Sequence, residues 1–235
     1  MSVAERLVEV CGRIEAACGK AGRDPAGVEL LAVSKTFPAE VIREAVEAGH
    51  RLFGESRQQE AEVKIPQLPA SLRWHFIGHL QSNKVRKVLP LVEALHSIDS
   101  VKLARQVDRV AEELGLFPKV FLEVNVGVEG GKHGFREDSL RESMEELLGL
   151  KRLELLGLMA IPPFVPEPEQ ARPWFAGLRE LRDRLEAESG VPLPGLSMGM
   201  SGDYEIAVEE GSTIVRVGSS IFGSRAGRQA TDGLQ

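Results

Sequence analysis

Two segments near the C-terminal end of the chain have the residue types of an anion-binding site. Residues 196–203 read Leu-Ser-Met-Gly-Met-Ser-Gly-Asp, and residues 212–223 read Ser-Thr-Ile-Val-Arg-Val-Gly-Ser-Ser-Ile-Phe-Gly. In each, a short strand-like run breaks into a small, hydroxyl-bearing turn that a helical pattern follows. Backbone N–H groups at such turns bind anions, and in an eight-stranded α/β barrel the loops after the last two strands commonly bind phosphate. In such a barrel, these segments predict a phosphorylated ligand.

A lysine near the start of the chain has a position suited to covalent chemistry. Lys35 follows an apolar run at residues 28–33, at the carboxyl end of an expected strand. Partial burial there lowers the pKa of an amine and makes it a nucleophile toward aldehydes; the alternative is a surface lysine in a loop. An amine and a phosphate site at one barrel mouth are what pyridoxal 5′-phosphate requires, because its aldehyde forms a Schiff base with lysine and its phosphate needs an anion site.

An arginine inside an expected strand is the second unusual residue. Arg216 lies in the run Ile214-Val215-Arg216-Val217, where a guanidinium is costly unless an acceptor meets it. Its side chain shares a face with Ile214 and Gly218. Facing the pocket, it can donate to the pyridine nitrogen of the cofactor and leave the ring neutral, which suits mild chemistry or none. The alternative is an outward arginine paired with a helix.

Other polar residues are less informative. His75 and His79 are close in sequence, but strand geometry separates them, so we predict no metal site. His79 lies past the strand end and could line the mouth, and Asn125, at the end of another expected strand, could hydrogen-bond a ligand there. Lys132, in a glycine-rich loop, is either a second amine near the site or a solvated residue.

The elements that must position these residues alternate between strands and helices. A capping box at Ser2 and Glu5 opens an N-terminal helix, and Pro38 opens a second helix that closes at Gly49. The pattern predicts a single (β/α)8 TIM-type barrel with an extra N-terminal helix; an open doubly wound sheet is the competitor, but its glycine-rich fingerprint is absent. Expected strands are residues 30–33, 51–54, 73–77, 94–98, 119–126, 153–160, 195–198 and 213–217, and the further expected helices are residues 56–64, 82–88, 101–114, 138–150, 167–189 and 203–210.

Length and composition fit one cytoplasmic domain. The chain has 235 residues, 43% of them apolar, and a net charge of −6, which argues against nucleic-acid and membrane-surface binding. Cys11 and Cys18 lie on one expected helix, too far apart for a disulfide, and we expect both to be buried thiols. No signal peptide or membrane span is evident. We expect a barrel over residues 1–225 and a flexible tail over residues 226–235.

These residues together resemble the family of pyridoxal phosphate homeostasis proteins, single-domain relatives of the barrel domain of alanine racemase. The runs at residues 74–84 and 196–201 are long enough to be highly specific. The matching segments follow the family's order over nearly the whole chain: residues 32–36, 53–55, 74–84, 157–159, 196–201 and 211–223.

The resemblance implies pyridoxal phosphate as cofactor and assigns roles to six residues. Lys35 is the lysine of the aldimine, and Arg216 meets the ring nitrogen. The phosphate is held by small residues of the last two loops: Ser201, Gly202, Gly218 and Ser219. Two departures from the family's pattern are Ser56, where an asparagine is usual, and Phe37, where a second lysine is frequent.

The sequence therefore predicts a protein that holds pyridoxal phosphate and serves intracellular cofactor homeostasis, by storage, delivery or regulation, without robust catalysis. The runner-up is a pyridoxal phosphate-dependent racemase-like enzyme, which needs a base on each face of its substrate, and only Lys35 is evident. A class I aldolase is a third reading, but it gives Arg216 no role. Expected partners are pyridoxal phosphate and the apo forms of enzymes that use it, with no nucleic acid or membrane, and we expect a monomer.

Overall fold

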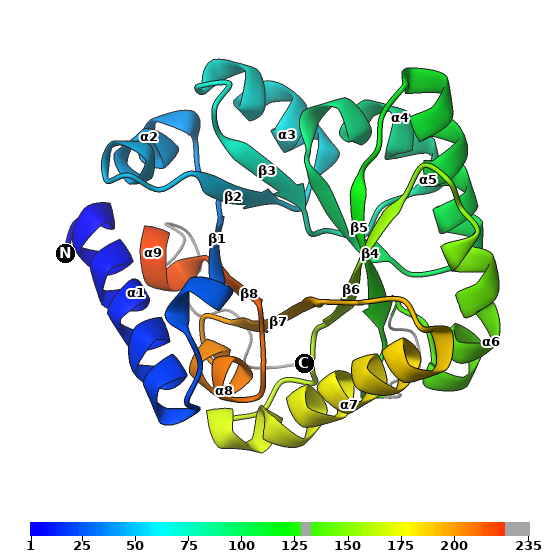
Figure 1. The fold of residues 1–235 in the computed structure, drawn as a ribbon. Coiled ribbons are helices and arrows are strands. Elements are labelled where there is room, and N and C mark those ends of the chain that lie inside the picture. The colour runs from blue at the N-terminus through cyan, green and yellow to red at the C-terminus, as the bar shows by residue number, and fades with distance from the viewer. Residues whose placement is uncertain (128–132, 224–235) are drawn as a thin grey trace, which may run out of the picture.

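Eight parallel strands form a closed barrel in which each strand pairs with the next and β8 pairs with β1. The computed structural model describes residues 1–127 and 133–223. Figure 1 shows the strands at the centre and the helices around them. The predicted barrel is confirmed, and the open doubly wound sheet was the wrong alternative. The strands are β1 Glu29–Val33, β2 Leu52–Glu55, β3 Arg73–Phe76, β4 Ala94–Ile98, β5 Lys119–Val124, β6 Glu154–Ala160, β7 Gly195–Met200 and β8 Ile214–Val217.

The helices fall close to the predicted segments. The helix expected from residue 167 begins as a 3₁₀ turn, Pro168–Ala171, before α7 starts at Arg172. The strand expected through residue 126 ends at Val124. The helices are α1 Val3–Lys20, α2 Ala39–Glu47, α3 Gln58–Lys64, α4 Val85–Val88, α5 Val101–Leu114, α6 Glu137–Leu148, α7 Arg172–Ser189, α8 Tyr204–Glu209 and α9 Ser219–Phe222.

The extra helix α1 covers the seam at which the barrel closes. The predicted capping box is present, because the Ser2 hydroxyl accepts from the Glu5 N–H and the Glu5 carboxylate accepts from the Ser2 N–H. The buried face of α1 packs in one core cluster with outward residues of β1 and β8, and α1 lies beside α8 and α9 (Figure 1). Burial of this apolar face stabilises the pairing of the first strand with the last.

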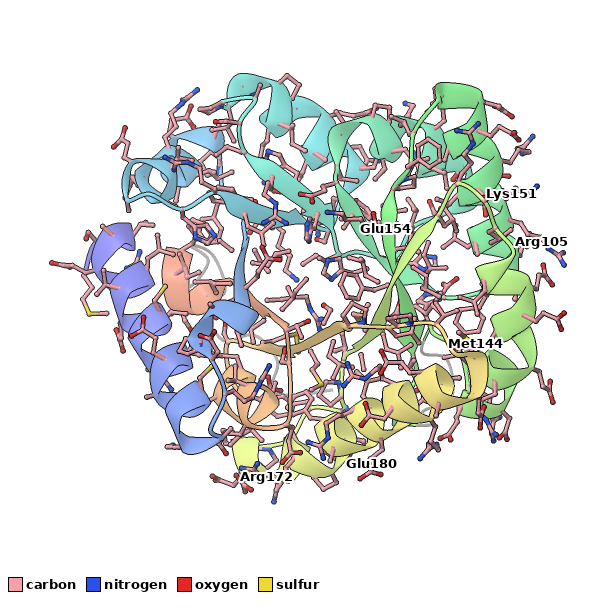
Figure 2. All side chains as sticks on the ribbon, viewed as in Figure 1. Arg105, Met144, Lys151, Glu154, Arg172 and Glu180 are labelled. Atoms are coloured by element: carbon pink, nitrogen blue, oxygen red, sulfur yellow. The ribbon has the colours of Figure 1, made fainter. Side chains whose placement is uncertain are left out.

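Side chains fill the interior of the barrel, while charged side chains such as Arg105, Lys151 and Glu180 lie on its outer rim (Figure 2). The inward core includes Leu31, Val33, Phe121, Met159 and Ile214. A Cβ at Gly157 would lie 1.9 Å from the carbonyl oxygen of Gly195, so β6 and β7 approach each other here only because residue 157 is glycine.

Both cysteines, Cys11 and Cys18, lie on α1. Both cysteines are free thiols as predicted; Cys18 is buried, but Cys11 is exposed, so its predicted burial was wrong. Cys11 lies on the face of α1 that points away from the barrel, whereas Val3, Leu7 and Val10 form the buried face. Within the described ranges, no helix is both long and apolar enough to cross a membrane. Lys132 and the expected tail, 226–235, lie outside the described residues.

Candidate functional site

All six residues singled out from the sequence line one cavity at the carboxyl ends of β1, β7 and β8. Its volume is about 360 Å³. Lys35 comes from the loop after β1, and the two small-residue turns come from the loops after β7 and β8. These loops are neighbours because β8 pairs with both β7 and β1. The predicted residues in the lining are Lys35, Ser201, Gly202, Arg216, Gly218 and Ser219, and Phe37 and Ser56 line it as well.

The half-buried Lys35 is held in a tight turn. The Phe37 N–H donates to the Ser34 carbonyl oxygen over 3.1 Å, and the Ser34 N–H donates to Gly54 of β2 over 3.0 Å. Thr36 has a φ of 71°, in the left-handed region that a β-branched residue rarely adopts. Such a conformation costs about 1–3 kcal/mol and persists only where the surroundings enforce it. The direction of the backbone at Lys35 is therefore imposed by its neighbours.

A buried ionic cluster from β2 and α3 hydrogen-bonds the backbone on both sides of Lys35. The Lys64 ammonium donates to the Glu55 carboxylate over 2.6 Å and to the Ser34 carbonyl oxygen over 2.9 Å. The Ser34 hydroxyl donates to the same Glu55 oxygen over 2.8 Å. On the other side, the Thr36 N–H donates to Glu60 over 2.7 Å, and Glu60 is paired with Lys64 at 3.0 Å. Sequence reasoning missed this cluster.

Burial sets the ionisation of this cluster. Desolvation raises the pKa of Glu55 despite hydrogen bonds from Lys64 and Ser34. Burial also opposes ionisation of Glu60, but the Thr36 N–H and the Lys64 ammonium outweigh it and hold the pKa of that carboxyl below its ordinary value. The Lys64 ammonium thus compensates two carboxylates at a site where water contributes little.

The β7 and β8 loops present backbone donors to the cavity. The N–H groups of Ser201, Gly202 and Ser219 donate to no acceptor among the described residues. The Gly218 N–H donates to the Ser201 hydroxyl over 3.2 Å, which ties the two loops together. A Cβ at Gly218 would lie 3.2 Å from the Val33 carbonyl oxygen, so glycine lets β8 approach β1 closely. Three backbone donors at one end of the cavity suit an anion.

Arg216 faces the interior of the barrel and lines the floor of the cavity; it is not the outward arginine of the alternative reading. Its side chain is 4% exposed. One terminal nitrogen donates to the Ser197 carbonyl oxygen and to the Ser197 hydroxyl, both at 2.6 Å, and the other donates to Ala160 at 2.9 Å. Burial lowers the pKa of Arg216 to about 10, against the opposing charges of Asp203 and Glu123, so the guanidinium is cationic at neutral pH.

A row of buried hydrogen bonds runs behind Arg216 through the barrel. The Ser197 hydroxyl lies 2.7 Å from His96 Nδ1, and His96 Nε2 lies 2.9 Å from His75 Nδ1. Because arginine only donates, Ser197 accepts from it and directs its own proton to His96. His96 then carries its proton on Nε2 and donates to His75. His75 in turn carries its proton on Nε2, which lies 4.0 Å from Glu93 at the opposite end of the barrel.

Both histidines of this row are neutral. Burial lowers the pKa of His75 to about 4, and burial, with the charges of His75 and Arg216, lowers that of His96 well below its ordinary value. Neutral imidazoles add no second positive charge to the buried Arg216 cation. The row therefore fixes the orientation of the guanidinium that the cavity exposes.

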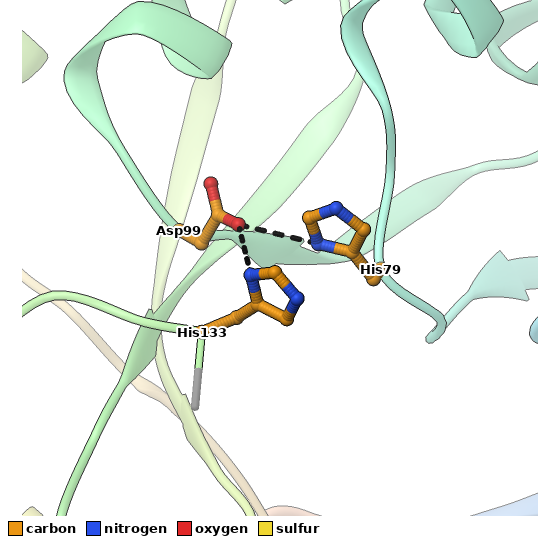
Figure 3. Close-up of side chains that lie close together, drawn as sticks. All are labelled: His79, Asp99 and His133. Carbon is orange, nitrogen blue, oxygen red and sulfur yellow. Dashed lines mark ion pairs between the residues drawn. The ribbon is translucent and has the colours of Figure 1, made fainter. Parts of the chain in front are cut away.

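The remaining sequence candidates lie elsewhere. Asn125 lines a separate cavity between β5, α6 and α7, so it is not beside Lys35. His79 lies at the carboxyl end of the barrel against Asp99 and His133 (Figure 3). His75 instead contacts His96, so the two histidines are separated as predicted. None of His79, Asp99 and His133 lines the Lys35 cavity.

Three comparisons place the chain among known proteins. The family model for the N-terminal domain of alanine racemase matches residues 14–226. The pyridoxal phosphate homeostasis protein of Aquifex aeolicus is 47% identical over 226 residues, which cover 96% of this chain and 99% of that protein. The PipY protein of Synechococcus elongatus, solved with pyridoxal phosphate bound, is 39% identical with a TM-score of 0.84, covering 94% of this chain and 100% of that one.

A more distant likeness concerns the fold alone. Alanine racemase of Clostridium difficile has a TM-score of 0.74 at 15% identity, with 98% of this chain matching 59% of the racemase chain. The full-length match in sequence is with the homeostasis proteins, and the match with the racemase is one of barrel architecture. The chain belongs to the pyridoxal phosphate homeostasis protein family, built on the barrel of the alanine racemase N-terminal domain.

Proposed function

We propose that this chain binds pyridoxal 5′-phosphate in the cavity at the ends of β1, β7 and β8. The observation that carries the proposal is the convergence of three groups on that cavity: the Lys35 amine, the Arg216 guanidinium and the backbone donors of the β7 and β8 loops. Lys35 would form a Schiff base with the cofactor aldehyde. The phosphate would accept hydrogen bonds from the N–H groups of Ser201, Gly202 and Ser219. The Gly218 N–H would also donate to it, in place of its hydrogen bond to the Ser201 hydroxyl.

Arg216 is suited to hold the pyridine nitrogen. Three of its donors are occupied by Ser197 and Ala160, while Nε–H and one terminal N–H have no acceptor in the described part of the chain. A pyridine nitrogen offers one acceptor lone pair. A cationic guanidinium has donors and no acceptor, so it stabilises the unprotonated form of that nitrogen and disfavours the pyridinium form.

The same cavity argues for holding the cofactor rather than for rapid catalysis. Bound pyridoxal phosphate supplies an electron sink, which is strongest when its ring nitrogen is protonated. Racemisation also needs a proton donor or acceptor on each face of the substrate. Among the described residues that line the cavity, Lys35 and Arg216 are the ionisable ones, and Arg216 is committed to its hydrogen bonds. We therefore favour a role in cofactor homeostasis over the racemase-like alternative.

Borohydride reduction of the purified protein, followed by peptide mass mapping, tests the cofactor assignment. The reduced pyridoxyl group should appear on Lys35, and the Lys35→Ala variant should lack the absorbance of the bound cofactor. Lys102→Ala, which removes an exposed lysine on α5, is the matched control and should retain that absorbance. A label on other lysines alone, or an unchanged spectrum in Lys35→Ala, would refute the assignment.

Pyridoxal without its phosphate tests the anion site separately. Charge-assisted hydrogen bonds are worth about 1.5–3 kcal/mol each, so loss of two or more should weaken binding by at least about a hundredfold. Equal affinities for pyridoxal and its phosphate would contradict the proposed phosphate site, whatever the result for Lys35.

The homeostatic role, the apo-enzyme partners and the monomeric state form the rest of the proposal. The loaded protein should restore the activity of an apo enzyme that requires pyridoxal phosphate, and light scattering during gel filtration should give the mass of one chain. Racemisation of L-amino acids should not exceed that of the free cofactor. Turnover at about 1–10³ per second, the usual range for enzymes, would favour the racemase reading.

A further inference from the structure

Three potential metal ligands converge at the carboxyl end of the barrel, outside the Lys35 cavity. His79 comes from the loop after β3, Asp99 follows β4, and His133 lies between β5 and α6. Their ligand atoms all lie within 4.8 Å of one another. In Figure 3 both imidazole rings turn one nitrogen toward the same carboxylate oxygen. Strand geometry separates His79 from His75, and the partners of His79 come instead from two other strands.

The distances fit coordination better than direct hydrogen bonding. Asp99 Oδ2 lies 3.3 Å from His79 Nδ1 and 3.6 Å from His133 Nδ1. Strong N–H···O bonds to a carboxylate are about 2.7–2.9 Å long. Around a tetrahedral zinc ion with bonds of about 2.0–2.2 Å, neighbouring ligand atoms lie about 3.3–3.5 Å apart. The two oxygen–nitrogen distances are thus close to the edges of such a tetrahedron, and the two imidazoles lie within 4.8 Å of each other by their ligand nitrogens.

Hydrogen bonds at or beside each of the three residues hold it in place. The Ser100 hydroxyl donates to the other Asp99 oxygen over 3.0 Å and also caps α5, so it orients the carboxylate. The Ser97 hydroxyl donates to the Gly78 carbonyl oxygen over 2.5 Å, which fixes the backbone before His79. After His133, the Phe135 N–H donates to the Glu123 carbonyl oxygen over 2.7 Å. With the carboxylate and the backbone held in this way, the imidazole rings are the groups that must turn to bind an ion.

The local charge also favours a cation. The Glu123 side chain is close enough to Asp99 and His133 to interact with both charges. A bound divalent ion would balance the negative charge of these carboxyl groups beside the two imidazoles.

We propose that His79, Asp99 and His133 form a binding site for a divalent ion of the zinc type at the mouth of the barrel. Two imidazoles and one carboxylate are the ligands that Zn²⁺ prefers, with solvent completing the shell. The rings are stacked, with centroids 3.7 Å apart, and a rotation of each ring directs its Nδ1 lone pair at the ion. The side chains of His79 and His133 are 41% and 56% exposed, so they have room to turn and the ion has access.

Calorimetric titration of the chelator-treated full-length protein with Zn²⁺, in a buffer free of phosphate, tests the site. We expect one ion per chain and a rise in melting temperature with added Zn²⁺. His79→Ala, His133→Ala and Asp99→Asn should each weaken binding by at least about tenfold, because loss of even an outer-shell partner commonly costs that much. Their melting temperatures without metal should stay near that of the original protein, because the two imidazoles are partly exposed.

Cys11→Ser is the matched control, because the exposed thiol is the competing zinc ligand in the described chain. It should leave the affinity unchanged. Absence of heat and of a melting shift at about 100 µM Zn²⁺ would overturn the proposal. Binding that survives in the His79→Ala/His133→Ala double variant would also overturn it, because the ion would then lie elsewhere. None of these outcomes depends on whether Lys35 holds the cofactor.

Discussion

Replacing Lys64 by methionine should destabilise the barrel strongly, because it removes the cation from a buried cluster. Glu55 is fully buried, and its Oε2 atom already has no hydrogen-bond partner among the described residues. Removing one partner of a buried ion pair typically costs about 3–5 kcal/mol. For a domain of this size that loss lowers the melting temperature by about 6–20 °C.

A double-mutant cycle isolates the contribution of the pair. Glu55→Gln in the Lys64→Met background removes the buried charge that was left without compensation, so the double variant should recover at least about 2 kcal/mol. Lys20→Met is the matched control: the Lys20 ammonium lies 3.5 Å from Glu209 but is 67% exposed, so its loss should change stability by less than about 0.5 kcal/mol.

The pH dependence gives an independent test. Glu55 has a pKa raised above its ordinary value of 4.5 by burial, and loss of Lys64 raises it further. A carboxyl group with a raised native pKa favours folding below its unfolded pKa and loses that contribution as pH rises through the native value. Lys64→Met should therefore lose stability from about pH 4.5 upward. Purely additive single effects, or a variant that is most stable at alkaline pH, would refute this account of the cluster.

Three further predictions concern residues in the interior of the barrel. Burial lowers the pKa of His75 to about 4, so the protein should lose up to about 3 kcal/mol as pH falls from about 6.5 to 4, and His75→Gln should flatten that part of the stability curve in urea titrations. Ser197→Ala leaves a buried guanidinium and a buried imidazole each short of a partner and should cost about 1–3 kcal/mol in the same assay. Gly157→Ala should prevent soluble expression, because its Cβ meets the Gly195 carbonyl oxygen, whereas Gly177→Ala, in a helix with open space around it, should stabilise by about 0.5–1 kcal/mol.

Local patterns predicted the elements and the residues that line the cavity. The apolar run before Lys35, the glycine and serine turns after β7 and β8, and the arginine inside β8 are all short-range signals. Each follows from a property of a few adjacent residues: a strand covered on both faces, a turn that exposes N–H groups, or a charge where an apolar residue is expected. The order of the elements then favoured a barrel over an open sheet, and a barrel brings its first and last loops together.

The contacts that hold those residues in place were decided only by the tertiary structure. Lys64 meets Glu55 from the far end of the helix that follows β2, and His96 meets Ser197 across the barrel interior. The same holds for His79, which follows β3: its partner Asp99 comes from the loop after β4 and not from the segment around His75. No local period predicts such pairs, because each depends on how a helix, a loop or a second strand packs against the strand that carries its partner. The types of the functional residues could be recognised in the sequence. Which buried charge meets which partner was decided by the packing of the elements in the folded barrel.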